Sequence, residues 1–108
     1  MTSGYALVVR FTTRDAGAAQ AFDALVARTL EGIRKEPGTL VYVSHIPEGE
    51  PLVRVFYELY ADEAAFQAHE DQSHTRAMLR EREQYLSSTE VTFLSEQAGK
   101  RPAPLEAP

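Results

Sequence analysis

Three segments have the composition of β-strands in which both faces are apolar: residues 5–12, 39–46 and 52–60. Successive side chains of a strand point to opposite faces, so Leu7 and Val9 would face one side while Ala6 and Val8 face the other. A sheet built from such strands needs apolar cover on both sides, because soluble monomers rarely expose large apolar patches. This need for cover on two sides limits the possible folds more than any other feature of the sequence.

A long amphipathic helix is predicted between the first two strands. Thr13 or Asp15 can cap its first turn through a side-chain oxygen, and Pro37 with Gly38 ends it. Its apolar positions follow the spacing that places side chains on one side of a helix: Phe22, Leu25, Val26, Leu30 and Ile33. This helix can therefore cover one face of the sheet.

The third strand leads into a broken helix. Asp62 can cap a short first piece, which carries His69 to its last turn. Ser73 can cap a second piece that runs over about residues 74–86, and a last strand is predicted at residues 90–95. Polar and titratable side chains flank the break, which makes it a candidate wall of a binding pocket.

The order of elements is β-α-β-β-α-β, which predicts an α+β fold with a ferredoxin-like, four-stranded antiparallel sheet and helices on one face. Residues 47–51 form a polar turn that joins the second and third strands as a hairpin. Since two helical regions can cover only one face, a second copy of the sheet is expected on the other, in a symmetric homodimer. Residues 1–95 are predicted to form this domain, and residues 96–108, with three prolines, a tail or partner-dependent arm.

Charge and composition exclude several classes of protein. With 16 acidic and 11 basic residues the 108-residue chain has a net charge of −5, which argues against nucleic acid or an anionic membrane as the main partner. The lack of cysteine excludes disulfides, thiolate metal sites and cysteine nucleophiles. No stretch approaches the roughly 20 apolar residues of a membrane span, so a cytoplasmic protein is expected.

Several short motifs carry a resemblance to a known family: Glu36-Pro37-Gly38 with Leu40, Tyr57-Glu58, Asp62 with Ala65 and His69, and Ser73-His74. Together with the element order and the two-sided strands, they resemble the antibiotic biosynthesis monooxygenase domain family over roughly residues 5–94. The family commonly has tryptophan two residues after the Tyr-Glu pair, where this chain has Tyr60. A differently shaped pocket is therefore expected.

The resemblance implies a dimeric α+β barrel and a small oxygenase that works without metal or flavin. Its substrates would be phenols, dihydroquinones or polycyclic aromatic molecules, with dioxygen as the second substrate. Such chemistry needs a base, hydrogen-bond donors for the resulting anion, and a dry apolar cavity. Haem-degrading relatives use a histidine ligand and a tryptophan where this chain has Leu79 and His69, so no haem and no other cofactor is expected.

The active site is predicted between the helices and the sheet, near residues 70–73. His69 is the first candidate for the base, because an unperturbed histidine titrates near neutral pH, and His74 is the second. Tyr57 or Tyr60 is the candidate donor to the phenolate. The candidate walls for a flat ring system are aromatic, aliphatic and thioether side chains: Val55, Tyr57, Phe66, Met78 and Tyr85.

Each of these side chains also has a purely structural interpretation. His69 could cap the last carbonyls of its helix, and His45 could lie in the dimer interface. Arg54 and Glu58 alternate on one strand face, where structural ion pairs are more common than catalysis. His69 and His74 are five residues apart across a break, which is not the i, i+4 spacing that presents two metal ligands on one helical face.

Two functions other than oxygenation remain open from the sequence. One is a non-catalytic dimer of the same fold that binds a ligand or supports an assembly. The other is a cyclase-like or isomerase-like enzyme that does acid–base chemistry on aromatic precursors without oxygen.

Overall fold

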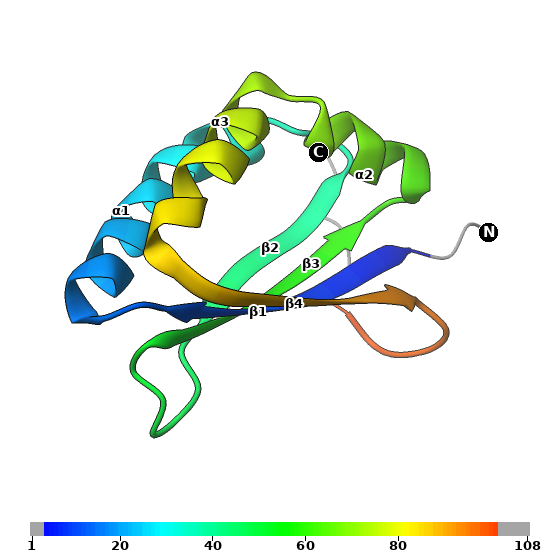
Figure 1. Cartoon of the computed structure of the whole chain (residues 1–108). Coiled ribbons are helices and arrows are strands. Elements are labelled where there is room, and N and C mark those ends of the chain that lie inside the picture. Colours follow the sequence, from blue (N-terminus) through cyan, green and yellow to red (C-terminus); the bar gives the residue numbers. More distant parts are fainter. Residues whose placement is uncertain (1–3, 102–108) are drawn as a thin grey trace, which may run out of the picture.

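Four strands form one antiparallel sheet in the order β2-β3-β1-β4, in a computed structural model that describes residues 4–101 (Figure 1). The strands are β1 (Tyr5–Thr13), β2 (Thr39–His45), β3 (Val53–Tyr60) and β4 (Leu86–Ser95). With the helices, the order of elements is the predicted β-α-β-β-α-β, and the ferredoxin-like α+β fold is confirmed. Within the described range, no helix is both long enough and apolar enough to cross a membrane.

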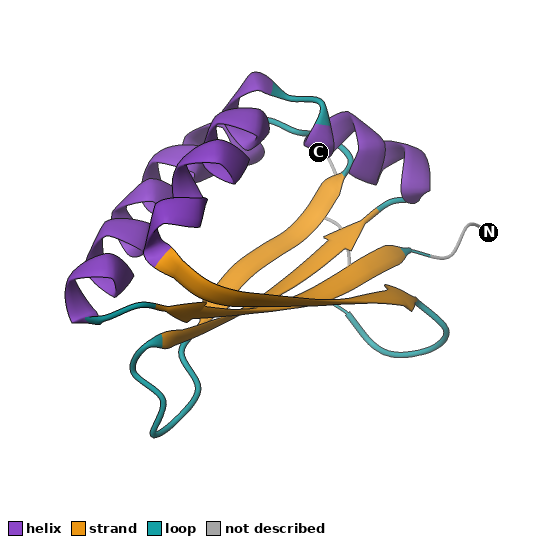
Figure 2. Ribbon diagram, in the orientation of Figure 1, coloured by secondary structure: helices purple, strands orange, loops and turns teal. Residues whose placement is uncertain are grey.

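All helices lie on one face of the sheet (Figure 2). They are α1 (Ala16–Ile33), α2 (Glu63–Glu70), α3 (Ser73–Glu81) and the short 3₁₀ helix η1 (Arg82–Tyr85). Two predicted caps are confirmed: Asp15 accepts from the Ala18 amide at 2.7 Å, and Asp62 accepts from the Ala65 amide at 2.8 Å. Each carboxylate thus satisfies an amide that has no partner within its own helix.

Two boundaries differ from the prediction. Ser73 is the first residue of α3 and not its cap, because Gln72 holds the extended cap position without a side-chain hydrogen bond. Leu86 does not end a helix; it is buried as the first residue of β4 and pairs with Thr13. Residues 87–89 are polar and exposed at the edge of the sheet, so they lack the apolar alternation that would have marked the longer strand.

The core between helices and sheet is built around aromatic rings. Phe11 of β1, Phe22 of α1 and Phe56 of β3 are almost fully buried, and the rings of Phe11 and Phe56 meet edge to face at 5.2 Å between centroids. Edge-to-face contacts favour a fixed arrangement of such rings. The inward face of β3 therefore carries Phe56 and the residues two positions before and after it, Arg54 and Glu58.

The opposite face of the sheet carries the second apolar set. Tyr57 pairs there with Val8 of β1 and Val43 of β2, and Val43 is 44% exposed. The chain after β4 turns back beneath this face, so residues 96–101 border a hollow lined by Val41 and Tyr57 (Figure 1). The rest of the predicted tail, residues 102–108, lies outside the described residues.

Candidate active site

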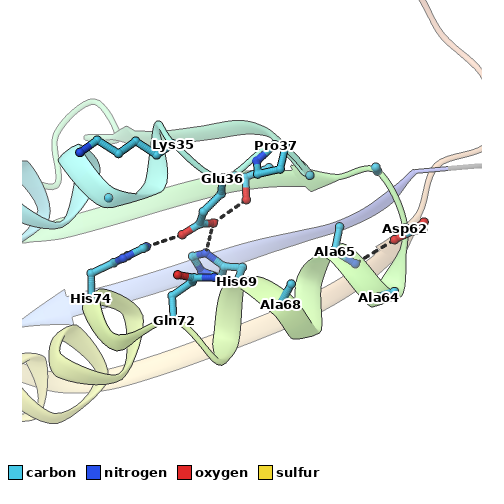
Figure 3. A pocket seen from close by; sticks show the side chains of 14 residues that line it. Lys35, Glu36, Pro37, Asp62, Ala64, Ala65, Ala68, His69, Gln72 and His74 are labelled. Carbon is cyan, nitrogen blue, oxygen red and sulfur yellow. Dashed lines mark hydrogen bonds and ion pairs between the residues drawn. The ribbon is translucent and has the colours of Figure 1, made fainter.

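A buried carboxylate joins the two histidines that flank the helix break (Figure 3). One oxygen of Glu36, Oε1, lies 2.8 Å from Nδ1 of His69, and the other, Oε2, contacts Nε2 of His74. Thr39 donates its hydroxyl to Oε1 at 2.7 Å. Only 8% of the Glu36 side chain and 5% of the His69 side chain are exposed, so this cluster is shielded from solvent.

Local backbone features place these groups together. Glu36 lies in the turn after α1, where its amide donates to the carbonyl of Ile33. The loop passes close to α2 at Gly38, because a Cβ there would fall 2.6 Å from the Cβ of Ala65. The ring of His74 lies against the α1 backbone at Gly32, where any side chain would clash with it. Two glycines thus allow α1, α2 and α3 to approach around one carboxylate.

Hydrogen bonds decide the charge of Glu36. Burial alone would raise its pKa, but hydrogen bonds from Thr39, His74 and His69 outweigh burial and lower the pKa below its usual value. Glu36 is therefore ionised at neutral pH and accepts the Nδ1 proton of His69. The other ring nitrogen of His69, Nε2, has no hydrogen-bond partner among residues 4–101. An ionised carboxylate behind a histidine is the arrangement that orients a general base.

His69 separates two hollows of different character. The first, here called the inner cavity, lies between helices and sheet and has a volume of about 110 Å³. Its walls combine seven apolar and six polar or charged residues: Leu7, Val9, Tyr42, Glu58, Phe66, His69, Glu70, Thr75, Met78, Leu79, Arg82, Val91 and Phe93. Apolar surface combined with convergent polar groups is typical of sites for small molecules.

The second hollow, here called the outer pocket, has a volume of about 790 Å³ and lies between α2 and the turn after α1 (Figure 3). Alanines of α2 form much of its floor, while Glu36, His74 and Gln72 line the end near the helix break. Glu36 is fully engaged by its three donors, and no phenylalanine or tyrosine lines the outer pocket, whereas Tyr42, Phe66 and Phe93 line the inner cavity. The inner cavity is the better candidate for the reacting centre.

Glu58 is a functional candidate that was interpreted from the sequence only as a member of a structural ion pair, and that interpretation is wrong for Glu58. Its carboxyl lines the inner cavity, accepts the Tyr60 hydroxyl at 2.7 Å, and makes no ion pair with any residue in the described range. Burial raises its pKa from 4.5 to about 7, against the opposing effect of the Tyr60 hydrogen bond. Arg54, its neighbour on the same strand face, pairs with Asp23 at 2.8 Å. The inward alternation of Arg54, Phe56 and Glu58 was the available signal.

The raised pKa of Glu58 has a consequence for stability. Because the folded state disfavours the ionised form, wild-type stability should fall as pH rises from 4.5 to about 7, by about 3 kcal/mol. Glu58→Gln keeps an acceptor for Tyr60 and removes this ionisation. The difference in unfolding free energy between variant and wild type, measured in urea at pH 5 and pH 8, should therefore shift by that amount in favour of the variant. Glu63→Gln, at an exposed position, is the control and should show the wild-type pH dependence of unfolding free energy. If Glu58→Gln also shows the wild-type pH dependence, the prediction is wrong.

The structure brings some of the predicted site residues together and separates others. His69, Phe66 and Met78 line the inner cavity, and Tyr60 packs against His69 with ring centroids 5.2 Å apart. His74 lines the outer pocket. Val55, Tyr57 and Tyr85 were also predicted as walls but do not line the inner cavity: Val55 and Tyr57 point to the helix-free face of the sheet, and the Tyr85 hydroxyl donates to Glu81 at 3.2 Å. His45 also lies on the helix-free face, with Nδ1 3.0 Å from the Val55 carbonyl oxygen.

The geometry offers no evident place for a metal ion within residues 4–101, where no group of three or more histidine, aspartate or glutamate side chains has a suitable arrangement. Glu36 lies between two histidines, but Nδ1 of His69 and Nε2 of His74 are hydrogen-bonded to its carboxylate and are not available to bind a metal ion.

Solved structures of similar fold cover almost the whole chain. A protein from Pseudomonas aeruginosa is 23% identical, with a TM-score of 0.81, and the match covers 91% of this chain and 98% of that one. A protein of unknown function from Nitrosomonas europaea is 27% identical, with a TM-score of 0.78 and coverage of 95% and 98%. A candidate antibiotic biosynthesis monooxygenase from Caulobacter crescentus is 19% identical, with a TM-score of 0.83 and coverage of 90% and 92%.

Sequence comparison gives the family directly. No curated protein is significantly similar to the chain. The family model described as antibiotic biosynthesis monooxygenase matches residues 4–81, a range that contains Glu36, Glu58, His69 and His74. The chain therefore belongs to the antibiotic biosynthesis monooxygenase family.

Proposed function

We propose that this protein is a cofactor-independent monooxygenase that oxidises a small phenolic, dihydroquinone or polycyclic aromatic molecule with dioxygen. The observation that carries the proposal is His69, which lines the inner cavity, is held at Nδ1 by the ionised Glu36, and has no hydrogen-bond partner at Nε2 among residues 4–101. A base, its orienting carboxylate and a water-poor space are the requirements of this chemistry. Family membership supports the same reaction class.

The proposed reaction begins when Nε2 of His69 removes the proton of a phenol, while Glu36 stabilises the imidazolium that forms. The electron-rich anion then transfers one electron to dioxygen, and the resulting radicals combine into a C–O bond. The peroxide takes up a proton and loses water, which leaves a carbonyl on the ring. One ring C–H, the phenolic C–OH and one O₂ thus become two C=O groups and one H₂O, so no other reductant is required.

Oxygen consumption tests this function. Wild-type protein should take up one O₂ per product molecule with at least one member of a panel of dihydroquinones and anthrones, as followed with an oxygen electrode and by mass spectrometry. Product without oxygen uptake would instead indicate an isomerase or cyclase. Binding without turnover across the panel would indicate a ligand-binding dimer.

A homodimer is part of the proposal, because the helix-free face of the sheet carries Val41, Val43 and Tyr57 without helical cover. Val43→Asp should convert a particle of about twice 12.0 kDa into monomers or unfolded chain, as measured by light scattering. Gln20→Asp places the same charge at an exposed position of α1 and should leave the mass unchanged. A wild-type protein that is a stable monomer at micromolar concentration would refute the dimer.

A further inference from the structure

Two buried polar atoms have no hydrogen-bond partner within residues 4–101, and both belong to walls of the inner cavity. They are the hydroxyl oxygen Oγ1 of Thr75, in α3, and the guanidinium nitrogen Nε of Arg82, in η1. Leaving a buried donor unpaired costs about 1–3 kcal/mol, so such groups usually have a purpose. Their meeting at one cavity suggests that a ligand satisfies both.

Thr75 departs from the usual behaviour of a threonine inside a helix. Thr29 of α1 shows that behaviour, since its hydroxyl donates to the Leu25 carbonyl at 2.8 Å. Thr75 is as deeply buried, at 4% exposure, yet its hydroxyl does not bond back to its own helix. Its donor remains available to a group in the cavity.

Arg82 likewise differs from the other inward arginine. Arg54 is paired through two hydrogen bonds to Asp23, at 2.8 and 3.0 Å. Arg82 instead lies over the ring of Phe11 at 5.0 Å and forms no ion pair with the part of the chain that the structure describes. A guanidinium in this setting keeps its full charge and has donors to spare.

The other titratable groups that line the cavity include two carboxylates, Glu58 and Glu70, so the net charge around an incoming anion depends on pH. Glu58 of β3 has a pKa raised to about 7 by burial, and burial likewise raises the pKa of Tyr42 of β2. Tyr42 is therefore uncharged at neutral pH, whereas Glu58 is largely uncharged only below pH 7 and about half ionised at pH 7. Glu70 and His69 of α2 complete the set of titratable groups that line the cavity. Arg82 is the one permanent cation among the cavity's walls.

The donors predicted from the sequence are not free for this role. Tyr60 already donates its hydroxyl to Glu58 at 2.7 Å, and Tyr57 points to the opposite face of the sheet. An anion formed next to His69 therefore needs other donors, and Thr75 and Arg82 line the same cavity as His69.

We propose that Thr75 and Arg82 bind the anionic oxygen of an ionised phenol or enol in the inner cavity. The volume of about 110 Å³ is smaller than the cavity of about 150 Å³ that is known to hold benzene, so the cavity would enclose only the oxygen-bearing part of an aromatic ring. Val91 and Phe93 of β4 border the cavity and are exposed, so further rings of a larger ligand would extend over them. This inference rests on the proposed function and narrows its substrates to phenols and enols that ionise readily. Binding of the anion by Thr75 and Arg82 can nevertheless be measured without any reaction with oxygen.

The probe for this site is 4-nitrophenol, whose phenolate absorbs visible light and whose neutral form does not. Wild-type protein should bind the phenolate about tenfold more tightly than the neutral phenol, so the bound probe ionises at a pH about one unit lower than the free probe. Thr75→Val and Arg82→Gln should each weaken phenolate binding by about tenfold in spectrophotometric titrations. Thr75→Ser and Arg82→Lys, which keep the hydroxyl and the charge, should recover a large part of it.

Arg80→Gln is the matched control, because it removes the same charge from an exposed position of α3 and should leave probe binding unchanged. Failure of the probe to bind, preference for its neutral form, or equal binding by Arg80→Gln and Arg82→Gln would each overturn the inference. The two proposals separate cleanly. If the protein binds phenolate but takes up no oxygen with any phenol, the anion site is supported and the oxygenase function is rejected. If Thr75→Val and Arg82→Gln oxygenate substrate as fast as wild type, the oxygenase function is supported and the anion site is rejected.

Discussion

Replacing His69 with alanine is expected to lower turnover of a confirmed phenolic substrate by roughly 10²–10⁴-fold, the usual contribution of a general base. The physical reason is the loss of Nε2 at the wall of the inner cavity, together with the imidazolium that Glu36 would stabilise. Initial rates of oxygen uptake at saturating substrate measure the effect. Substrate affinity should change much less than the rate, because the proton acceptor acts mainly in the transition state.

The fold of the His69→Ala variant can be checked by circular dichroism and by its mass in solution. Gln67→Ala alters an exposed position of the same helix and should retain wild-type turnover. If His69→Ala and His74→Ala both keep full activity, neither histidine is the base, and Glu58, which lines the same cavity, becomes the next residue to test. A slow His69→Ala variant that small imidazole bases accelerate would support proton transfer as the lost step.

Replacing Glu36 with alanine is expected to reduce both stability and turnover. The carboxylate holds His69, His74 and Thr39 together, so its removal leaves their buried polar groups unpaired. Leaving a buried neutral donor such as Nδ1–H of His69 without a partner typically costs about 1–3 kcal/mol, measurable as a loss of unfolding free energy in urea. Turnover should also fall by at least 10²-fold, because His69 loses the group that fixes its Nδ1 proton.

The pH dependence gives this second prediction an internal check. Since its hydrogen bonds lower the pKa of Glu36 below 4.5, its contribution should be complete above pH 4.5 and disappear as pH falls through the lower folded-state value. The gap in stability between wild type and Glu36→Ala should therefore narrow in acid. Glu31→Gln, at an exposed position of α1, should show no such change. A gap that stays constant down to the acid limit would mean that the carboxylate charge is not what stabilises this cluster.

Local chemistry made much of the fold predictable. Asp15 and Asp62 could be recognised as helix starts because each precedes a segment with helical spacing of apolar residues. The short side chain of an aspartate at this position accepts a hydrogen bond from a free amide of the first turn. The strands β1, β2 and β3 were recognisable because their alternation is strongly apolar. The first half of β4 was not, since Ser88 and Thr89 pair with β1 through backbone groups that any sequence provides, and Ser87 lies at an irregularity of the pairing.

The site was predictable only in part. His69 could be recognised because both its residue type and its position next to a predicted helix break can be read from the sequence. Glu36 was part of a recognised motif without an assigned role, because its partners lie 33 and 38 residues further along the chain. Thr75 and Arg82 could not be found from the sequence. What distinguishes them is the lack of a partner at a cavity wall, and that depends on the packing of every element around them.

The place of β1 in the sheet also affects how the chain can fold as it is made. This strand lies between β3 and β4, so one edge pairs within the first 60 residues and the other only with residues 86–95. During synthesis, a nascent chain that has passed Tyr60 can assemble three strands, but β1 then remains an open edge until the last strand leaves the ribosome. An unpaired apolar edge is a site for association with other chains. We therefore expect the late arrival of β4 to be the step at which this small domain is most dependent on chaperones.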